Sequence, residues 1–210
     1  VDFDAFESAL RPDTRCFLLC NPHNPVGKVF TRSELEKLAE ICLRHDLVII
    51  SDEIHSDILF EGQTHLPIAS LSKEVADQTV TLIAPSKTFN IAGLESAILI
   101  CQNRALLKRI NQSRRGLMGG VNLMGLTAAV AAYREGDTWL KEMIEVLEVN
   151  REFVDRFVRE RMPLIKMRKP DATYLSWMDC TDLGLSEPPA DFFLKEAGIA
   201  LNKGADFGEG

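Results

Sequence analysis

The chain has 210 residues, a formal net charge of −7 and a sequence pI near 5.2. This acidic balance argues against nucleic-acid binding, because neutralising phosphates requires clustered cations. No apolar stretch approaches the ~20 residues of a membrane span and no secretory signal opens the chain, so we expect no membrane partner.

Three short apolar runs in the first half predict β-strands, at residues 15–20, 47–50 and 79–84. Their nearly unbroken apolar character is typical of strands buried on both faces of a parallel sheet. Residues 31–45, between the first two runs, have apolar side chains at helical spacing and begin with a capping-box pattern, Thr31 to Glu34. A helix-sized segment at 66–78 precedes the third run. This alternation predicts an α/β fold with a mostly parallel sheet and crossover helices.

The second half predicts further elements in chain order: a strand at 96–101, a basic helix at 104–115 and a buried helix at 121–133. A long amphipathic helix at 138–162 follows, ended by Pro163. The remaining elements are short strands at 164–167 and 173–178 and a helix at 190–197. We therefore expect three parts: a partial large domain at 1–137, a connecting helix at 138–162 and a partial small domain at 163–210.

Three polar residues follow the first three predicted strands: Asn24, Asp52 and Lys87. Ligands of open α/β sheets bind beyond the carboxyl ends of the strands, where these residues would meet. Taken singly, each has a simpler interpretation: Lys87 caps a turn, Asp52 is a helix cap or loop acid, and Asn24 is a turn residue. A partly desolvated lysine at such a position is, however, suited to act as a nucleophile or base.

Together the three side chains match the needs of pyridoxal phosphate. This cofactor requires a lysine to hold its aldehyde as an imine and a carboxylate to keep its ring nitrogen protonated. A neutral donor near the ring hydroxyl is also useful. Lys87, Asp52 and Asn24 supply these groups in turn.

The motifs around these residues resemble the three signatures of the class I/II, fold type I, pyridoxal-phosphate aminotransferases: NPHNPVG at 21–27, SDEIH at 51–55 and SKTFNIAGL at 86–94. His55 and the stretches at 65–70 and 172–179 are similar to the cystathionine β-lyase branch, the C-S lyases of the MalY/PatB type. The resemblance implies a large domain of fold type I with part of a smaller α+β C-terminal domain. It also implies that Lys87 binds the cofactor covalently, that Asp52 pairs with the pyridinium nitrogen and that Asn24 bonds the ring hydroxyl.

Two departures from the family pattern concern how the cofactor is held. His55 stands where many aminotransferases have a tyrosine, so we expect it to share the tuning of the ring hydroxyl. Glu95 stands where many have a phosphate-binding arginine, and Ala84 where they have a serine. Phosphate binding must then come from Ser86, from backbone N–H groups or from residues outside this chain.

Compared with the family, the chain lacks the N-terminal third and the C-terminal end. We therefore expect a fragment that by itself binds the cofactor weakly. The resemblance implies a homodimer for the full-length protein, for which we expect β-elimination from cystathionine or a related cysteine thioether. Transamination of an amino acid is the alternative, and a regulatory or catalytically inactive fragment is the second alternative.

The five cysteines form no metal-type pair, and we expect no metal site. They lie mostly within predicted elements, where packing in the core is the simplest interpretation. Their number and placement weakly favour a reducing compartment, the cytoplasm.

Overall fold

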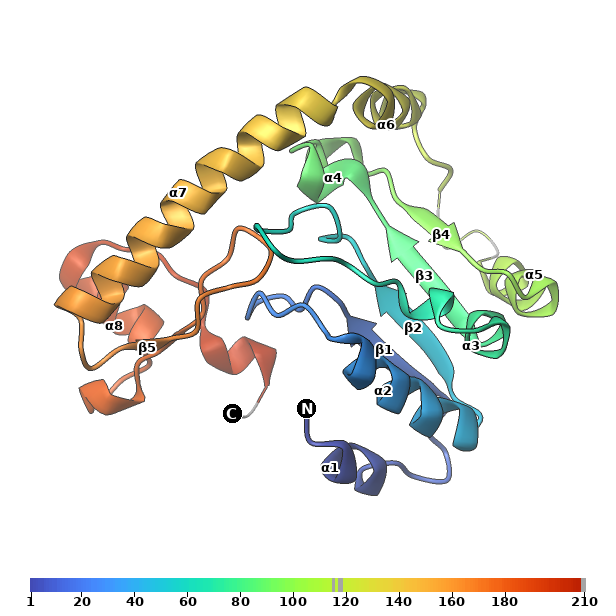
Figure 1. Cartoon of the computed structure of the whole chain (residues 1–210), viewed down its shortest axis with the longest axis horizontal. Coiled ribbons are helices and arrows are strands. Elements are labelled where there is room, and N and C mark those ends of the chain that lie inside the picture. Colours follow the sequence, from blue (N-terminus) through green and yellow to red (C-terminus); the bar gives the residue numbers. More distant parts are fainter. Residues whose placement is uncertain (115, 117–118, 209–210) are drawn as a thin grey trace.

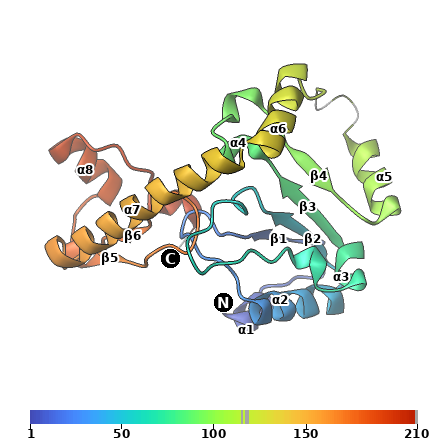
Figure 2. The same ribbon diagram turned by 45° about the horizontal axis from the view of Figure 1, so that its top comes forward.

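The computed structural model describes residues 1–114, 116 and 119–208. Its larger part is a four-stranded sheet with its helices, and a long helix, α7 (Asp137–Arg161), leads from there to a smaller part formed by the C-terminal residues (Figure 1, Figure 2). Two predicted boundaries, the helix end at Arg115 and the domain end at Gly210, lie outside the described residues.

The sheet brings the ends of the first three strands to one edge. β1 (Cys16–Cys20), β2 (Val48–Asp52) and β3 (Thr79–Ile83) are parallel neighbours, and β4 (Ile98–Ile100) is antiparallel to β3. Cys20 is in register with Asp52, which is in register with Leu82. The prediction of an α/β fold with a mostly parallel sheet is therefore confirmed.

One face of the sheet carries the core. α2 (Arg32–Arg44) begins with the predicted capping box, in which Thr31 and Glu34 bond each other's backbone. The helix buries an apolar stripe against the sheet, and residues before, within and after β2 complete this core. The core consists of Leu19, Leu35, Leu38, Ala39, Cys42, Leu47, Ile49, Ile68 and Val75. α1 (Phe3–Ser8) packs beside α2 through partly buried phenylalanines.

The opposite face of the sheet is open at β1, which corrects the prediction of strands buried on both faces there. At β3 the same face is covered, since Val80 is 5% exposed. Leu18 of β1 points away from the α2 core and is 67% exposed. All three residues of β4 are also exposed. The reason is that, in the described part of the chain, α2 and its neighbours cover only the face that carries Leu19 and Ile49.

The helix predicted at 66–78 is instead two short helices, η1 (Ile68–Ser70) and α3 (Lys73–Asp77). Ser72 has an extended backbone and its side chain accepts a hydrogen bond from the Val75 N–H, so it starts α3 as an N-cap. A continuous helix cannot pass through a residue in that conformation. The crossover from β2 to β3 is thus made of a loop and two short helices.

α4 (Pro85–Thr88) and η2 (Ala92–Leu94) follow β3 directly, and α5 (Arg104–Ser113) follows β4. α6 (Leu123–Glu135) then runs beside α4. The prediction that α6 is buried is wrong: Leu123 is 76% exposed, and only Gly125 and Ala129 are buried on this helix. Its Ala- and Leu-rich composition did not distinguish a core helix from one with an uncovered apolar face.

α7 matches the predicted amphipathic helix at 138–162. The smaller part after it holds α8 (Pro189–Ala197), which matches the helix predicted at 190–197 and is ended by Gly198, with η3 (Thr181–Leu183) and η4 (Gly204–Phe207). The two predicted strands there are much shorter, β5 (Lys166–Met167) and β6 (Met178–Asp179). Residues 172–173 do not extend β6, because they bond instead to a loop of the larger part, at Leu59 and Ile58.

The division into domains at residues 137 and 163 stays a prediction. Among the described residues, no helix combines the length and apolar character needed to cross a membrane.

Candidate active site

Asp52 is the last residue of β2, and its side chain is half-buried at the sheet edge. Its Oδ1 accepts a hydrogen bond of 3.2 Å from the Ile54 N–H, which fixes the turn that follows the strand. Burial raises the pKa of the neighbouring Cys20 thiol, and the negative charge of Asp52 raises it further. The carboxylate therefore lies at the junction of β1 and β2.

Asn24 lies in the loop that leaves β1, and its side chain is exposed. The Asn24 N–H contacts the Cys20 Sγ at 3.5 Å. The same loop is anchored by buried Asn21, whose Oδ1 accepts from the Phe30 N–H at 3.2 Å and whose N–H donates to the Asp52 carbonyl oxygen at 3.0 Å. Asn24 thus reaches the same edge as Asp52, although no hydrogen bond joins their side chains among the described residues.

His55 follows Asp52 in the turn after β2 and is only 2% exposed. Both ring nitrogens are buried without a hydrogen-bond partner among the described residues. Burial lowers the pKa of His55, the positive charge of Lys87 lowers it further, and the negative charge of Asp52 opposes this. His55 is therefore a neutral imidazole, within electrostatic reach of Asp52 and Lys87, with two unsatisfied polar atoms.

Lys87 and Ser86 are half-buried in the single turn of α4, just past the end of β3. The next residue, Thr88, is fully buried and donates a hydrogen bond of 2.9 Å from its Oγ1 to Asp57 Oδ2. Asp57 belongs to the loop that carries His55. The structure thus joins the Lys87 turn to the His55 loop.

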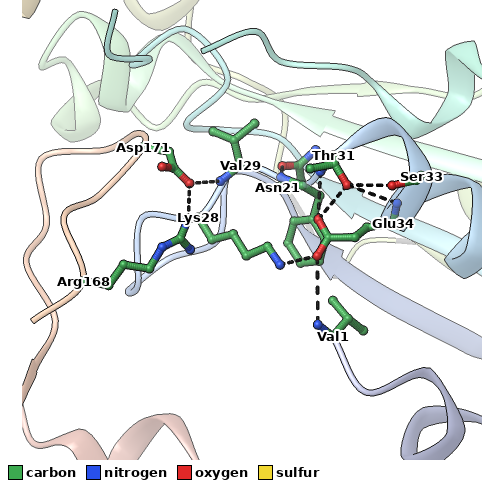
Figure 3. A network of polar contacts seen from close by, with 10 residues as sticks. Val1, Asn21, Lys28, Val29, Thr31, Ser33, Glu34, Arg168 and Asp171 are labelled. Atoms are coloured by element: carbon green, nitrogen blue, oxygen red, sulfur yellow. Dashed lines mark hydrogen bonds and ion pairs between the residues drawn. The ribbon is translucent and has the colours of Figure 1, made fainter. Parts of the chain in front are cut away.

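A segment from the smaller part, residues 170–174, contacts the Asn24 loop on one side. The N–H groups of Asp171 and Ala172 both donate to the Gly27 carbonyl oxygen, at 2.8 and 3.1 Å. Asp171 Oδ2 accepts from the Val29 N–H at 3.3 Å and from Arg168 Nη2 at 2.6 Å (Figure 3). Segment 170–174 is therefore bonded directly to the loop that presents Asn24.

On its other side, segment 170–174 contacts the His55 loop. The Thr173 N–H donates to the Ile58 carbonyl oxygen at 2.9 Å, and Thr173 is buried with a φ of +71°. The ring of Tyr174 meets the ring of His55 edge-on, with centroids 5.7 Å apart. This segment therefore fixes the spacing between the Asn24 loop and the His55 loop.

The sequence analysis assigned no role to three features of the site. Tyr174, Asp57 and the pair Glu53–His65 act through contacts between distant parts of the chain. Glu53 is buried and accepts from Ser51 Oγ at 2.8 Å, and its Oε2 lies 2.7 Å from His65 Nε2. His65 is therefore a partly buried partner of Glu53. The alternation of Ser51, Asp52 and Glu53 along an extended strand was the available signal, because it sends Asp52 and Glu53 to opposite faces.

The departures at the phosphate positions are visible in the structure. Glu95 is exposed with a φ of +49°, and Ala84 is buried before α4 without a side-chain cap. In the described ranges, no group of three or more His, Cys, Asp or Glu residues is arranged to hold a metal ion. The site therefore offers one amine, one carboxylate, one neutral imidazole, a hydroxyl and an amide at a single sheet edge.

The charge of Lys87 provides a direct test of this geometry. In the apo protein, Lys87→Met should raise the pKa of His55 toward its ordinary value, because one of the two effects that lower it is removed. Proton NMR titration of the four histidines measures this shift. His23 is the internal control, since burial and Lys28 lower its pKa. A His55 midpoint that does not move in this variant would contradict the proximity of the two side chains.

Comparison with known proteins adds an independent finding. A family model described as "Aminotransferase class I and II" matches residues 1–209. Cystathionine beta-lyase PatB from Bacillus subtilis is 43% identical over 213 residues, covering 100% of this chain and 55% of PatB. A cystathionine beta-lyase from Corynebacterium glutamicum is 36% identical over 207 residues, covering 99% of this chain and 55% of that protein.

Among solved structures, cystalysin from Treponema denticola, which contains a pyridoxal 5'-phosphate cofactor, superimposes with a TM-score of 0.93 at 35% identity. The match covers 99% of this chain and 54% of cystalysin. The chain thus spans about half the length of the relatives it matches.

Proposed function

Because the chain belongs to the class I and II aminotransferase family, we propose that the full-length protein is a pyridoxal-phosphate enzyme acting on an amino acid. The reaction we propose is β-elimination from cystathionine or a related cysteine thioether. The names of two similar proteins, both cystathionine beta-lyases, support this choice over other reactions of the family.

The observation that carries the proposal is the convergence of Asp52, His55 and Lys87 beyond parallel strands. The His55 ring, buried with both nitrogens unsatisfied, fits a polar ligand beside it, since such atoms are normally paired. Pyridoxal phosphate needs an amine for its aldehyde and a carboxylate for its ring nitrogen, and a neutral imidazole can bond its ring hydroxyl. The residues present therefore fit this cofactor.

Bound pyridoxal phosphate supplies an aldehyde for amino groups and a protonated ring that accepts electrons from the α carbon of an amino acid. In this proposal Lys87 Nζ would hold the aldehyde of the cofactor and, as a free amine, would take the α proton of the bound amino acid. Asp52 holds the proton on the ring nitrogen. Asn24 and His55 bond the ring hydroxyl, and Ser86 contributes to binding the phosphate.

The overall reaction breaks the Cβ–S bond of the substrate. Lys87 takes the α proton, the sulfur leaves as a thiol, and the remaining aminoacrylate reacts with water to give pyruvate and ammonia. Transamination is the second candidate, favoured by the description of the family model. It needs the same Asp52 and Lys87 but transfers the amino group to a keto acid instead of releasing ammonia.

Pyruvate release separates the two reactions. We expect full-length protein supplied with cystathionine and pyridoxal phosphate, but no keto acid, to form one pyruvate for each thiol released. Lactate dehydrogenase with NADH measures the pyruvate, and a thiol reagent measures the other product. If pyruvate is absent and turnover instead requires an added keto acid, transamination is the correct assignment.

We also propose a homodimer and a cytoplasmic location for the full-length protein. The exposed apolar side chains of α6 support an interface between subunits; they are Leu123, Met124, Leu126, Val130 and Tyr133. Five cysteines without disulfides support a reducing compartment. Sedimentation equilibrium of the full-length protein tests the dimer, and a monomer at micromolar concentration would contradict it.

A further inference from the structure

α4 is too short to hold its own position. It has four residues, Pro85–Thr88, and no side chain caps its first turn. A single helical turn is unfavourable in isolation, since fixing its backbone costs more than its few hydrogen bonds return. The place of Lys87 within the site must therefore be set by what α4 contacts.

The polar contact that anchors α4 is the hydrogen bond from Thr88 Oγ1 to Asp57 Oδ2, at 2.9 Å. Thr88 is 0% exposed and follows Lys87 directly. Asp57 lies just past His55, where the Ile58 N–H closes the turn by donating to the His55 carbonyl oxygen at 3.0 Å. The bond thus connects the backbone beside Lys87 to the backbone beside His55.

We propose that Asp57 is a positioning residue for Lys87: by accepting the Thr88 hydroxyl hydrogen bond, its carboxylate holds the α4 turn, and with it Lys87, beside the His55 loop. The role rests on the proposed function. Asp57 does not itself contact the reacting atoms in this scheme. It acts through Thr88, and its effect is on where the Lys87 amine lies.

A second observation places the Asp57 carboxylate in the same part of the molecule. Burial raises the pKa of Tyr133 on α6, and the negative charge of Asp57 raises it further. The ring of Phe89, at the end of α4, meets the ring of Tyr133 edge-on with centroids 5.6 Å apart. Asp57 therefore lies beside both α4, through Thr88, and α6, through Tyr133.

The test uses a nearly isosteric change that removes the hydroxyl, Thr88→Val, in the full-length protein. Thr79→Val is the matched control, because Thr79 is also buried and its Oγ1 donates to the Val75 carbonyl oxygen at 2.7 Å, but at the opposite end of β3. We expect Thr88→Val to weaken pyridoxal-phosphate binding about tenfold, as loss of a hydrogen bond to a charged acceptor does. Thr79→Val should leave the affinity unchanged, and Thr88→Ser should restore it.

A second readout needs no cofactor. In the apo protein, the acetylation rate of Lys87, followed by peptide mass spectrometry, should rise severalfold in Thr88→Val because the freed turn exposes the amine. The exposed Lys73 serves as the internal reference. Asp57→Asn should also lower the pKa of Tyr133, which absorbance at 295 nm detects when the titration is compared with that of a Tyr133→Phe variant.

The outcomes separate this inference from the proposed function. Equal affinities and equal Lys87 acetylation rates in Thr88→Val and Thr79→Val would overturn the positioning role. If wild-type protein shows no visible absorbance band with pyridoxal phosphate, the proposed function fails. In that case the acetylation rates still decide whether Asp57 and Thr88 fix Lys87.

Discussion

Lys87→Ala should eliminate covalent attachment of pyridoxal phosphate and lower turnover by at least about 10²–10⁴-fold, the range attributed to a positioned general base. The effect is large because the same amine is proposed to bind the cofactor and to move the substrate α proton. The motifs at 21–27 and 51–55 contain no lysine, and Lys28, which follows the first of them, is paired with Glu34. A neighbouring amine is therefore not expected to take over.

Borohydride reduction followed by peptide mass spectrometry measures the attachment. In wild-type protein, the reduced cofactor should be found on the peptide that contains Lys87, and in Lys87→Ala it should be found on none. Lys73→Ala is the control, since Lys73 is an exposed lysine paired only with Asp77 at 2.5 Å. Retention of activity in Lys87→Ala would exclude the whole mechanism.

Lys87→Ala should still bind the cofactor without a covalent bond. Asp52, His55 and Asn24 keep their positions, because none of them is bonded to the Lys87 side chain. An added small primary amine is then expected to restore part of the turnover. Rescue of this kind distinguishes loss of the amine from collapse of the site.

The sequence was informative where structure depends on neighbours along the chain. The capping box of α2, the end of β1 at Cys20 and the end of α8 before Gly198 all follow from residues within a few positions of each other. The end of β2 does not, since β2 continues to Asp52, two residues beyond the predicted run at 47–50. The parallel arrangement followed from the alternation of strands and helices. The common edge of Asn24, Asp52 and Lys87 was therefore predictable as a location.

The hydrogen bonds that hold the loops of the site together were not predictable in the same way. Asp57 and Thr88 are separated by 31 positions, and Val29 and Asp171 by 142. Neither pair belongs to a periodic pattern. Thr173 has a left-handed backbone, which a β-branched residue rarely adopts. Its residue type instead favoured an extended backbone, and the strand was therefore predicted to begin at this residue. These contacts depend on tertiary packing, which overrides local preference.

Which apolar faces are covered by other elements could also not be predicted from the sequence. The composition of α6 and β1 indicated burial, yet Leu123 and Leu18 are exposed. An apolar stripe indicates that one face of an element avoids water, but it does not indicate which other element covers that face. The pairing of Glu53 with His65 was also not predictable from the sequence, because it depends on how the loop after β2 folds back.

The second large effect is expected at Gly27, where the Asn24 loop meets segment 170–174. Gly27 has a φ of +67°, and a Cβ there would overlap the Cβ of Pro170 and lie 2.8 Å from the Ala172 carbonyl oxygen. Gly27→Ala should lower the free energy of unfolding by about 2–5 kcal/mol, since left-handed strain and overpacking act together. Urea unfolding followed by fluorescence of the two tryptophans measures the loss.

Gly62→Ala separates the two causes. Gly62 has a φ of +81° with no heavy atom within 4 Å of the built Cβ, so this variant carries the strain without the overlap, about 1–2 kcal/mol. Gly27→Ala should also speed hydrogen exchange at the Asp171 and Ala172 amides, because both donate to the Gly27 carbonyl oxygen. Gly62→Ala should leave both amides protected. Equal losses and equal exchange in the two variants would mean that close approach to Pro170 does not hold the Asn24 loop.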